Sequence, residues 1–224
     1  MRSLSRGEII EQMLRLNRLL NSDERLSHVV VMGMGEPLAN LPNLLAALDD
    51  ATGPGGLGVS VRRVTISTVG LPGAIRRLAD YGRAYHLAVS LHAADDQLRN
   101  QLVAVNRSVG LRPILDATDY FFERTGRRPT FEYVLLAGIN DRGDHARRLG
   151  DLLCGRPALV NLIPYNPVLG LPYDEPSAEA VSRFVSLLRQ RGINVQLRQR
   201  KGDAIDAACG QLRRAASDTI APGR

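Results

Sequence analysis

A cysteine at position 209 is the residue of this chain with the clearest chemical potential. Cys209 is one of two cysteines among 224 residues and lies in the segment RKGDAIDAACGQL, downstream of Arg198, Arg200 and Lys201. Positive charge favours the thiolate form of a cysteine, which is the form that acts as a nucleophile. The competing interpretation is a buried structural cysteine between alanines, and spacing alone favours that interpretation.

Two further polar residues stand where a strand-like run ends. Pro37 restrains Glu36 to an extended conformation, which would hold its carboxylate beyond the strand, ready to bind an ammonium group. The alternative is that Glu36 is simply an acidic residue before a helix that begins near Leu41. Asn166, in the segment IPYNP, could orient a ligand through its amide or could form a turn.

The elements that would position these residues alternate along the chain. Strands are expected at 28–35, 62–68, 85–92, 130–139, 158–165 and 194–200. Helices are expected at 5–21, 41–51, 71–82, 95–105, 112–125, 144–154 and 177–191. Strands joined by such helices need right-handed crossovers, so the sheet is parallel, either open and doubly wound or curled into a complete or partial barrel.

The residues that follow the strands favour a barrel. Each strand finishes in a polar or Gly/Pro-rich segment: GEP (35–37), STVG (67–70), SLH (90–92), GIND (138–141), YNP (165–167) and KGD (201–203). In a parallel β/α fold these ends share one edge, where ligands bind. Polar endings on every strand favour a cup over a single crevice, so the predicted fold class is α/β with a barrel-like sheet.

Two strands also present small polar residues on one face. Thr65 and Ser67 share a face of their strand, and Ala88, Ser90 and His92 share a face of theirs. Small side chains inside a barrel leave room for a ligand. They would equally serve as fillers where a barrel interior tapers.

Composition limits the class of protein. The net charge is +6 with a pI near 9.9, and nearly all basic residues are arginines. Paired arginines permit an RNA-facing surface, although scattered pairs commonly just keep a surface solvated. There is no apolar run of about 18 residues and no signal-peptide core, so we expect a cytoplasmic protein with no membrane partner. Two cysteines are too few for an all-cysteine metal site.

Five segments together carry a family resemblance. MGMGEPL (32–38), RRVTISTVG (62–70), AVSLHAADD (88–96), NLIPYNP (161–167) and KGDAIDAACGQL (201–212) resemble, in order, the radical SAM adenine-C2 RNA methyltransferases, the RlmN and Cfr family. The similarity runs from about residue 5 to residue 214, and the RlmN branch is the closer. The resemblance implies a partial (β/α)6 radical-SAM-type barrel over residues 1–214, with 215–224 as a disordered tail.

The resemblance also implies a site. Gly35 and Glu36 would hold the amino group of S-adenosylmethionine, and further residues would line the rest of that ligand. Those residues are Ser67, Ser90, Leu91, His92 and Asn166. Cys209 would carry the methyl group: its thiolate takes a methyl from one S-adenosylmethionine, and a deoxyadenosyl radical from a second one activates that methyl for addition to C2 of adenine. C2 offers no nucleophilic lone pair, so a polar methyl transfer would fail there.

The implied substrates are adenosines of large-subunit rRNA and tRNA. The family's radical step needs a reductant and a 4Fe-4S cluster held by a CxxxCxxC loop, and we expect the first strand and this loop to be missing from the chain, with an N-terminal partner chain as one source. Cys154, in the apolar segment LGDLLCG, is expected at a core helix position. Two alternatives are a non-catalytic module that binds S-adenosylmethionine or RNA, and a barrel enzyme for a phosphorylated metabolite.

Overall fold

The computed structural model describes residues 2–32, 35–168 and 170–198. Within these residues, six parallel strands form one sheet in the order of the sequence. The strands are β1 (Val29–Val31), β2 (Val64–Thr68), β3 (His86–Ser90), β4 (Thr130–Leu135), β5 (Leu159–Pro164) and β6 (Asn194–Leu197). All six predicted strands and the α/β class are therefore confirmed.

One helix precedes the first strand, and the others occupy the segments between successive strands, as predicted. They are α1 (Arg6–Arg18), α2 (Leu41–Thr52), α3 (Pro72–Asp80), α4 (Asp96–Leu102), α5 (Asn106–Val109), α6 (Leu111–Thr125), α7 (Gly143–Leu153) and α8 (Ala178–Gln190), with 3-10 turns η1 (Pro37–Asn40) and η2 (Val61–Arg63). The single helix predicted at 95–105 is wrong in one respect. Val103 adopts an extended backbone and separates α4 from α5.

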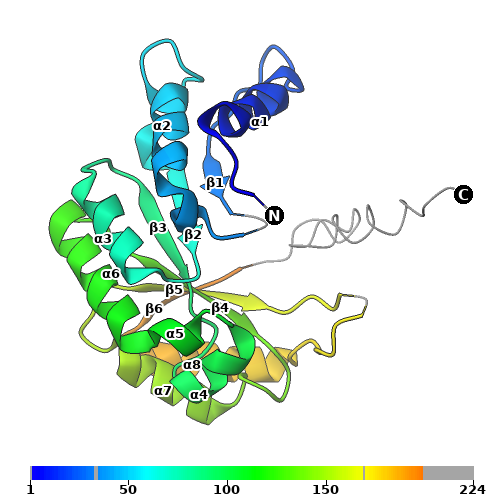
Figure 1. Cartoon of the computed structure of the whole chain (residues 1–224). Helices are drawn as coiled ribbons and strands as arrows, with labels where there is room; N and C mark the ends of the chain where they lie inside the picture. Colours follow the sequence, from blue (N-terminus) through cyan, green and yellow to red (C-terminus); the bar gives the residue numbers. More distant parts are fainter. Residues whose placement is uncertain (1, 33–34, 169, 199–224) are drawn as a thin grey trace, which may run out of the picture.

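The strand order decides between the two kinds of sheet that the sequence left open. A doubly wound sheet reverses its order once, whereas here every strand lies beside its sequence neighbour. Right-handed crossovers in one direction place all connecting helices on the same side. Figure 1 shows this arrangement, with α3, α6, α7 and α8 along one side of the sheet. The result is a partial barrel whose concave face carries no helix layer of the described chain.

Alternation along the strands separates core from concave face. Ile66, Val89, Tyr133 and Val160 are fully buried and belong to the hydrophobic core between sheet and helices. Their neighbours in sequence point to the other side of the sheet. In β2, Val64 and Ile66 are fully buried, and Thr65 between them is half-buried, as expected if Thr65 points to the other face.

Several sequence-based expectations need correction. The predicted strand 130–139 ends at Leu135, because Gly138 has a φ of +70° and the chain turns there. Cys154 is not a core helix residue: it is exposed and forms the C-cap of α7. The proposed boundary at residue 214 lies outside the described residues.

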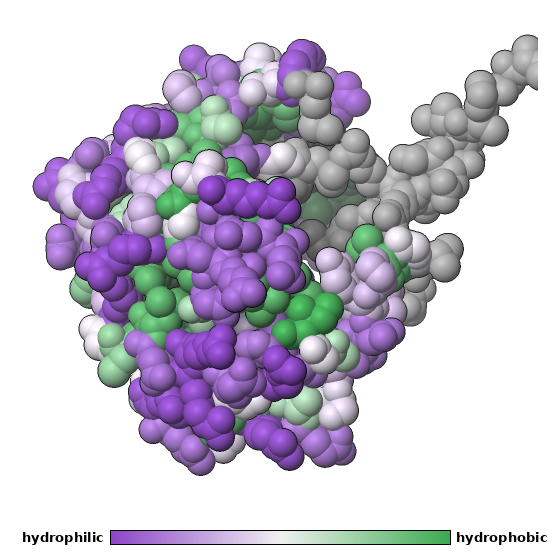
Figure 2. All heavy atoms as spheres, turned by 60° about the horizontal axis from the view of Figure 1, so that its bottom comes forward, coloured by the Kyte–Doolittle hydropathy of each residue, from purple (hydrophilic) through white to green (hydrophobic). Residues whose placement is uncertain are grey.

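Hydrophilic side chains cover much of the face seen in Figure 2, with hydrophobic residues in smaller areas between them.

Candidate functional site

The predicted ligand residues follow or end strands at the carboxyl edge of the sheet. Gly35 and Glu36 follow β1, Ser67 lies in β2, and Ser90 ends β3. Leu91 and His92 come next in the chain, and Asn166 follows β5. Cys209 lies outside the described residues, so the structure does not place it. The edge therefore gathers residues from four strands that are up to about 130 positions apart in sequence.

Glu36 joins the ends of β1 and β2. Its Oε1 accepts a hydrogen bond from the Leu38 N–H at 2.9 Å, which caps η1, and its Oε2 accepts one from the Val69 N–H at 2.8 Å. Glu36 therefore caps the 3-10 turn η1, whereas the helix that begins at Leu41 has Asn40 as its N-cap. Because a carboxylate can accept about four hydrogen bonds, both oxygens keep capacity for a ligand.

A groove of about 580 Å³ opens beside Glu36. Its lining includes Gly35, Met32 and the segment 2–4. Gly35 has a φ of +112°, a conformation that requires glycine, and open space surrounds the position of a Cβ there. Backbone groups at Gly35 are consequently accessible to a ligand in the groove.

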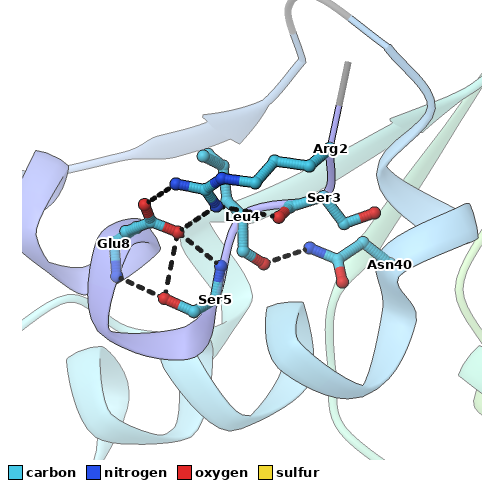
Figure 3. A network of polar contacts seen from close by, with 6 residues as sticks. All are labelled: Arg2, Ser3, Leu4, Ser5, Glu8 and Asn40. Carbon is cyan, nitrogen blue, oxygen red and sulfur yellow. Dashed lines mark hydrogen bonds and ion pairs between the residues drawn. The ribbon is translucent and has the colours of Figure 1, made fainter.

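Another part of the lining of this groove comes from the segment before α1. Figure 3 shows Asn40, at the end of η1, donating a hydrogen bond from its Nδ2 to the Leu4 carbonyl at 2.7 Å. Ser5 and Glu8 form a capping box at the start of α1, and Arg2 pairs with Glu8. These contacts hold segment 2–5 against η1, so the groove has two defined walls.

His92 is held at the boundary between β3 and β4. It has a φ of 60°, unusual for a residue with a Cβ, and its Nδ1 accepts a hydrogen bond from the Val134 N–H at 3.2 Å. Burial of the ring, and to a smaller extent the charge of Arg99, lower the pKa of His92 to about 4. The imidazole is therefore neutral at pH 7, with its proton on Nε2.

Asn140, from the GIND segment after β4, also makes hydrogen bonds to residues at the ends of β3 and β4. It is fully buried, and its Nδ2 donates to the carbonyls of His92 and Val134 at 2.9 and 2.8 Å. Its Oδ1 accepts from the Leu136 N–H at 2.7 Å. Because the amide satisfies three main-chain groups at once, it locks the turn after β4 to the end of β3. The sequence marked this ending as polar but did not single out Asn140.

Leu91 and Ser67 occupy more enclosed positions. The Leu91 side chain is fully buried, its N–H donates to the Glu132 carbonyl at 2.9 Å, and its carbonyl accepts from Arg99 at 3.0 Å. Ser67 is 8% exposed, on the opposite side of β2 from Ile66. Of the SLH triplet, Ser90 lies on the side of β3 opposite the buried Val89, and His92 follows the strand with a left-handed backbone.

A polar row crosses the concave face below this edge. Ser90, Glu132, Asn161 and Gln196 pair in register across β3, β4, β5 and β6. Asn161 Nδ2 donates to Glu132 Oε2 at 2.8 Å, and burial raises the pKa of Glu132. Sequence reasoning missed Glu132 and Asn161, although strand alternation would have placed both on the face of Ser90.

The segment after β5 carries Asn166 and an aromatic pair. Tyr165 donates its N–H to the Leu135 carbonyl at 3.0 Å, which ties the end of β5 to the end of β4. The Tyr165 and Tyr173 rings meet edge to face at 5.9 Å. Asn166 is half-buried beside them, and Figure 1 shows the loop that follows extending away from the sheet.

The described residues do not fit an iron–sulfur cluster. Cluster ligands are cysteine thiolates, and Cys154 is the one cysteine in this part of the chain. No group of three or more His, Cys, Asp or Glu side chains within the described ranges could hold a metal ion. No helix in the same ranges is long and apolar enough to cross a membrane.

A partial parallel barrel with polar residues gathered at the carboxyl edge defines the class of protein as a β/α barrel, a fold in which ligand sites commonly lie at that edge. Comparison with family models gives the particular family: the model of the radical SAM superfamily matches residues 2–149. The chain belongs to the radical SAM superfamily.

Individual relatives agree with this assignment. The chain is 62% identical over 213 residues to a "Probable dual-specificity RNA methyltransferase RlmN" of Rhodopirellula baltica, covering 95% of this chain and 57% of that protein. A protein of the same name from Enterococcus faecalis is 44% identical, with 95% and 61% covered. The chain therefore spans about three-fifths of these relatives. Their names confirm the resemblance to the RlmN branch.

A solved structure agrees as well. The crystal structure of a radical SAM methyltransferase from Sphaerobacter thermophilus superposes with a TM-score of 0.90 at 40% identity, covering 94% of this chain and 62% of that one. A domain of a pyruvate-formate lyase-activating enzyme from Bacteroides vulgatus shares the fold alone, with a TM-score of 0.60 at 18% identity. The partial-barrel fold is confirmed by these likenesses.

Proposed function

We propose that this chain is the S-adenosylmethionine-binding barrel of an RNA methyltransferase that methylates C2 of adenine in large-subunit rRNA and tRNA. The observation that carries the proposal is the 62% identity to the Rhodopirellula baltica protein over 95% of the chain. The carboxyl edge supports it, because hydrogen bonds of Glu36, His92 and Asn140 join the ends of adjacent strands, where the other predicted ligand residues lie.

Each residue has a role suited to its surroundings. The free lone pairs of Glu36 and the backbone at Gly35 would accept the ammonium of S-adenosylmethionine. Ser67, Ser90 and the neutral His92 would contact the remainder of the ligand, His92 as a donor through Nε2–H, while Leu91 would act through its backbone. Asn166 would close the site from the loop after β5.

Cys209 is the proposed methyl carrier. Its thiolate would attack the methyl carbon of S-adenosylmethionine, so that a thioether forms on Cys209 as S-adenosylhomocysteine leaves, and the cationic residues Arg198, Arg200 and Lys201 would favour the ionised thiol. We propose that the 4Fe-4S cluster of the superfamily, which supplies the electron for radical chemistry, is held outside the described residues and is served by a separate reductant. The RNA substrates imply action in the cytoplasm.

Calorimetric titration with S-adenosylmethionine tests the ligand site. We expect the chain to bind it, and Ser90→Ala to weaken binding about fivefold or more because one polar contact is worth about 1 kcal/mol. Ser182→Ala, an exposed serine on α8, is the matched control and should leave affinity unchanged. No heat of binding by the unmodified chain would refute the proposed site.

The methyl carrier is tested in the complete methyltransferase reaction. Cys209→Ala should abolish formation of 2-methyladenosine in rRNA and tRNA, measured by mass spectrometry of the digested nucleosides, while affinity for S-adenosylmethionine stays the same. Cys154→Ala is the control, since Cys154 is exposed at the end of α7. Undiminished product from the Cys209→Ala variant would contradict the assignment.

A further inference from the structure

Arg99 is a buried charged residue that neither the sequence motifs nor the proposed mechanism uses. It lies in α4 and is fully buried. Its guanidinium makes hydrogen bonds through Nε, Nη1 and Nη2 to four acceptors. A buried arginine costs desolvation free energy, so its retention calls for a physical reason.

Three of the four acceptors are main-chain carbonyls at the ends of two adjacent strands. Nη2 donates to Ser90 O at 2.8 Å and to Val69 O at 2.7 Å, and Nε donates to Leu91 O at 3.0 Å. The register between β2 and β3 reaches only Thr68 opposite Val89. Arg99 therefore joins the two strands at the point where their own ladder of hydrogen bonds stops.

The hydrogen-bond network of Arg99 also reaches Glu36, which follows β1. Val69 donates its N–H to Glu36 and accepts a hydrogen bond from Arg99 through its carbonyl. The backbone of this one residue thus connects the carboxylate after β1 to the guanidinium of Arg99. One hydrogen-bond network therefore connects the proposed ligand residues at the ends of β1, β2 and β3.

Asn106 fixes the orientation of the guanidinium. Arg99 Nη1 donates to Asn106 Oδ1 at 2.5 Å, and Asn106 Nδ2 donates in turn to Asp96 and Asn100 at 2.9 and 2.8 Å. Burial lowers the pKa of Arg99 to about 10, and the charge of Asp96 opposes that effect. Arg99 keeps its charge at neutral pH, and its hydrogen-bond acceptors are carbonyl oxygens rather than carboxylates.

We propose that Arg99 is a positioning residue for the ligand site, and that its planar fork sets the spacing between Ser67 on β2, Ser90 at the end of β3 and His92 just after it. The ligand in question, S-adenosylmethionine, rests on the proposed function. A lysine cannot replace this role, because its single ammonium cannot reach both strand ends and Asn106 with a fixed geometry. A purely structural arginine would stabilise the whole domain without a particular effect on these strand ends.

The test compares Arg99→Lys with Arg156→Lys in the full chain. Arg156 is a suitable control because it is also partly buried, in an ion pair with Asp119. In Arg99→Lys we expect amide hydrogen exchange at Val69 and Leu91 to accelerate about tenfold or more, with the Leu162 amide in β5 changed less than about twofold. Affinity for S-adenosylmethionine should fall about tenfold. Arg156→Lys should change neither.

Two outcomes would overturn the proposal. If Arg99→Lys accelerates exchange at Val69, Leu91 and Leu162 by one common factor, Arg99 acts through global stability alone. If affinity is unchanged while Val69 and Leu91 exchange faster, the spacing does not govern the ligand. Should the unmodified chain bind no S-adenosylmethionine, the proposed function fails, yet the exchange pattern still decides whether Arg99 positions the strand ends.

A second variant protects the test against loss of folding. Asn106→Ala removes one acceptor of Arg99 and leaves the three carbonyl contacts in place. We expect the same local pattern of exchange, at about threefold, because the guanidinium loses its orientation but not its other partners. If amide exchange at Val69, Leu91 and Leu162 accelerates by one common factor in this variant, the proposal is likewise overturned.

Discussion

At the carboxyl edge of the sheet, two polar side chains that join neighbouring strand ends are buried, whereas at the amino edge the polar contacts between helices α3 and α6 are exposed. Asn140 and Arg99 are fully buried at the carboxyl edge. At the amino edge, where α3 ends before β3 begins, Asp80 accepts hydrogen bonds from Tyr120 and Arg124. The side chains of Arg124 and Asp80 are 56% and 50% exposed.

This difference in burial indicates at which edge the loss of a polar contact should cost more free energy of unfolding. An exposed partner that loses its contact is solvated by water, so the net cost is small. A buried main-chain group that loses its partner keeps the full cost of desolvation. The carboxyl edge is therefore the region in which single polar substitutions should disturb both stability and the geometry of the ligand residues.

Asn140→Ala should give the largest effect. It would leave the Leu136 N–H and the carbonyls of His92 and Val134 without their partner, at a cost of about 3 kcal/mol in the free energy of unfolding. Urea denaturation monitored by circular dichroism measures it. Asn43→Ala, on the exposed side of α2, should cost less than about 0.5 kcal/mol. Equal costs for the two variants would show that the burial of Asn140 and its main-chain partners does not determine the cost.

His92 should make the carboxyl edge sensitive to acid. Its folded pKa of about 4 lies below the ordinary value near 6.5, so the unfolded chain binds more protons and stability falls as pH drops between these values. Between pH 7 and pH 5, the titration of His92 should lower the free energy of unfolding by about 2 kcal/mol.

Comparison with a variant isolates this contribution, because burial also lowers the pKa of His86 and His145. His92→Asn is suitable, since asparagine tolerates a positive φ and offers an acceptor for the Val134 N–H. Urea denaturation at pH 7 and at pH 5 measures how far the free energy of unfolding falls with pH. That fall should be smaller by about 2 kcal/mol in the variant. The same loss in both proteins would mean that His92 is not held neutral by the fold.

The smallest effect is expected at the amino edge. A double-mutant cycle on Asp80→Asn and Arg124→Gln should give a coupling of about 0.5 kcal/mol or less, reduced further in 1 M salt. Thermal or urea denaturation of the four proteins measures it. A coupling above about 2 kcal/mol would show that this edge, too, is held by its polar pairs.

Most of the fold was accessible from the sequence. Alternating apolar runs and helical periods predicted every strand and the main helices, because a strand or helix must bury one face and its spacing records that need. The ends were less certain. The strand predicted to reach residue 139 stops at Leu135, and the helix predicted at 95–105 breaks at Val103, because local backbone turns override the apolar pattern.

The site was accessible only in part. Polar endings indicated the carboxyl edge, and the motifs indicated Glu36, Ser67, Ser90, His92 and Asn166. Arg99 was missed because an arginine on a short helix is ordinarily solvated. Its acceptor Val69 is 30 residues away in sequence. Cys154 was misplaced because the apolar residues before it suggested a continuing core helix, whereas α7 ends at Leu153.

The sequence by itself determined the parallel β/α architecture and the edge at which polar residues gather, since hydrophobic periodicity and the direction of the strands depend on local order along the chain. Only the tertiary structure decided which polar side chains hold the strand ends and which remain free for a ligand. A buried donor or acceptor takes its partner from whatever group the fold brings within about 3 Å, and those groups come from distant segments.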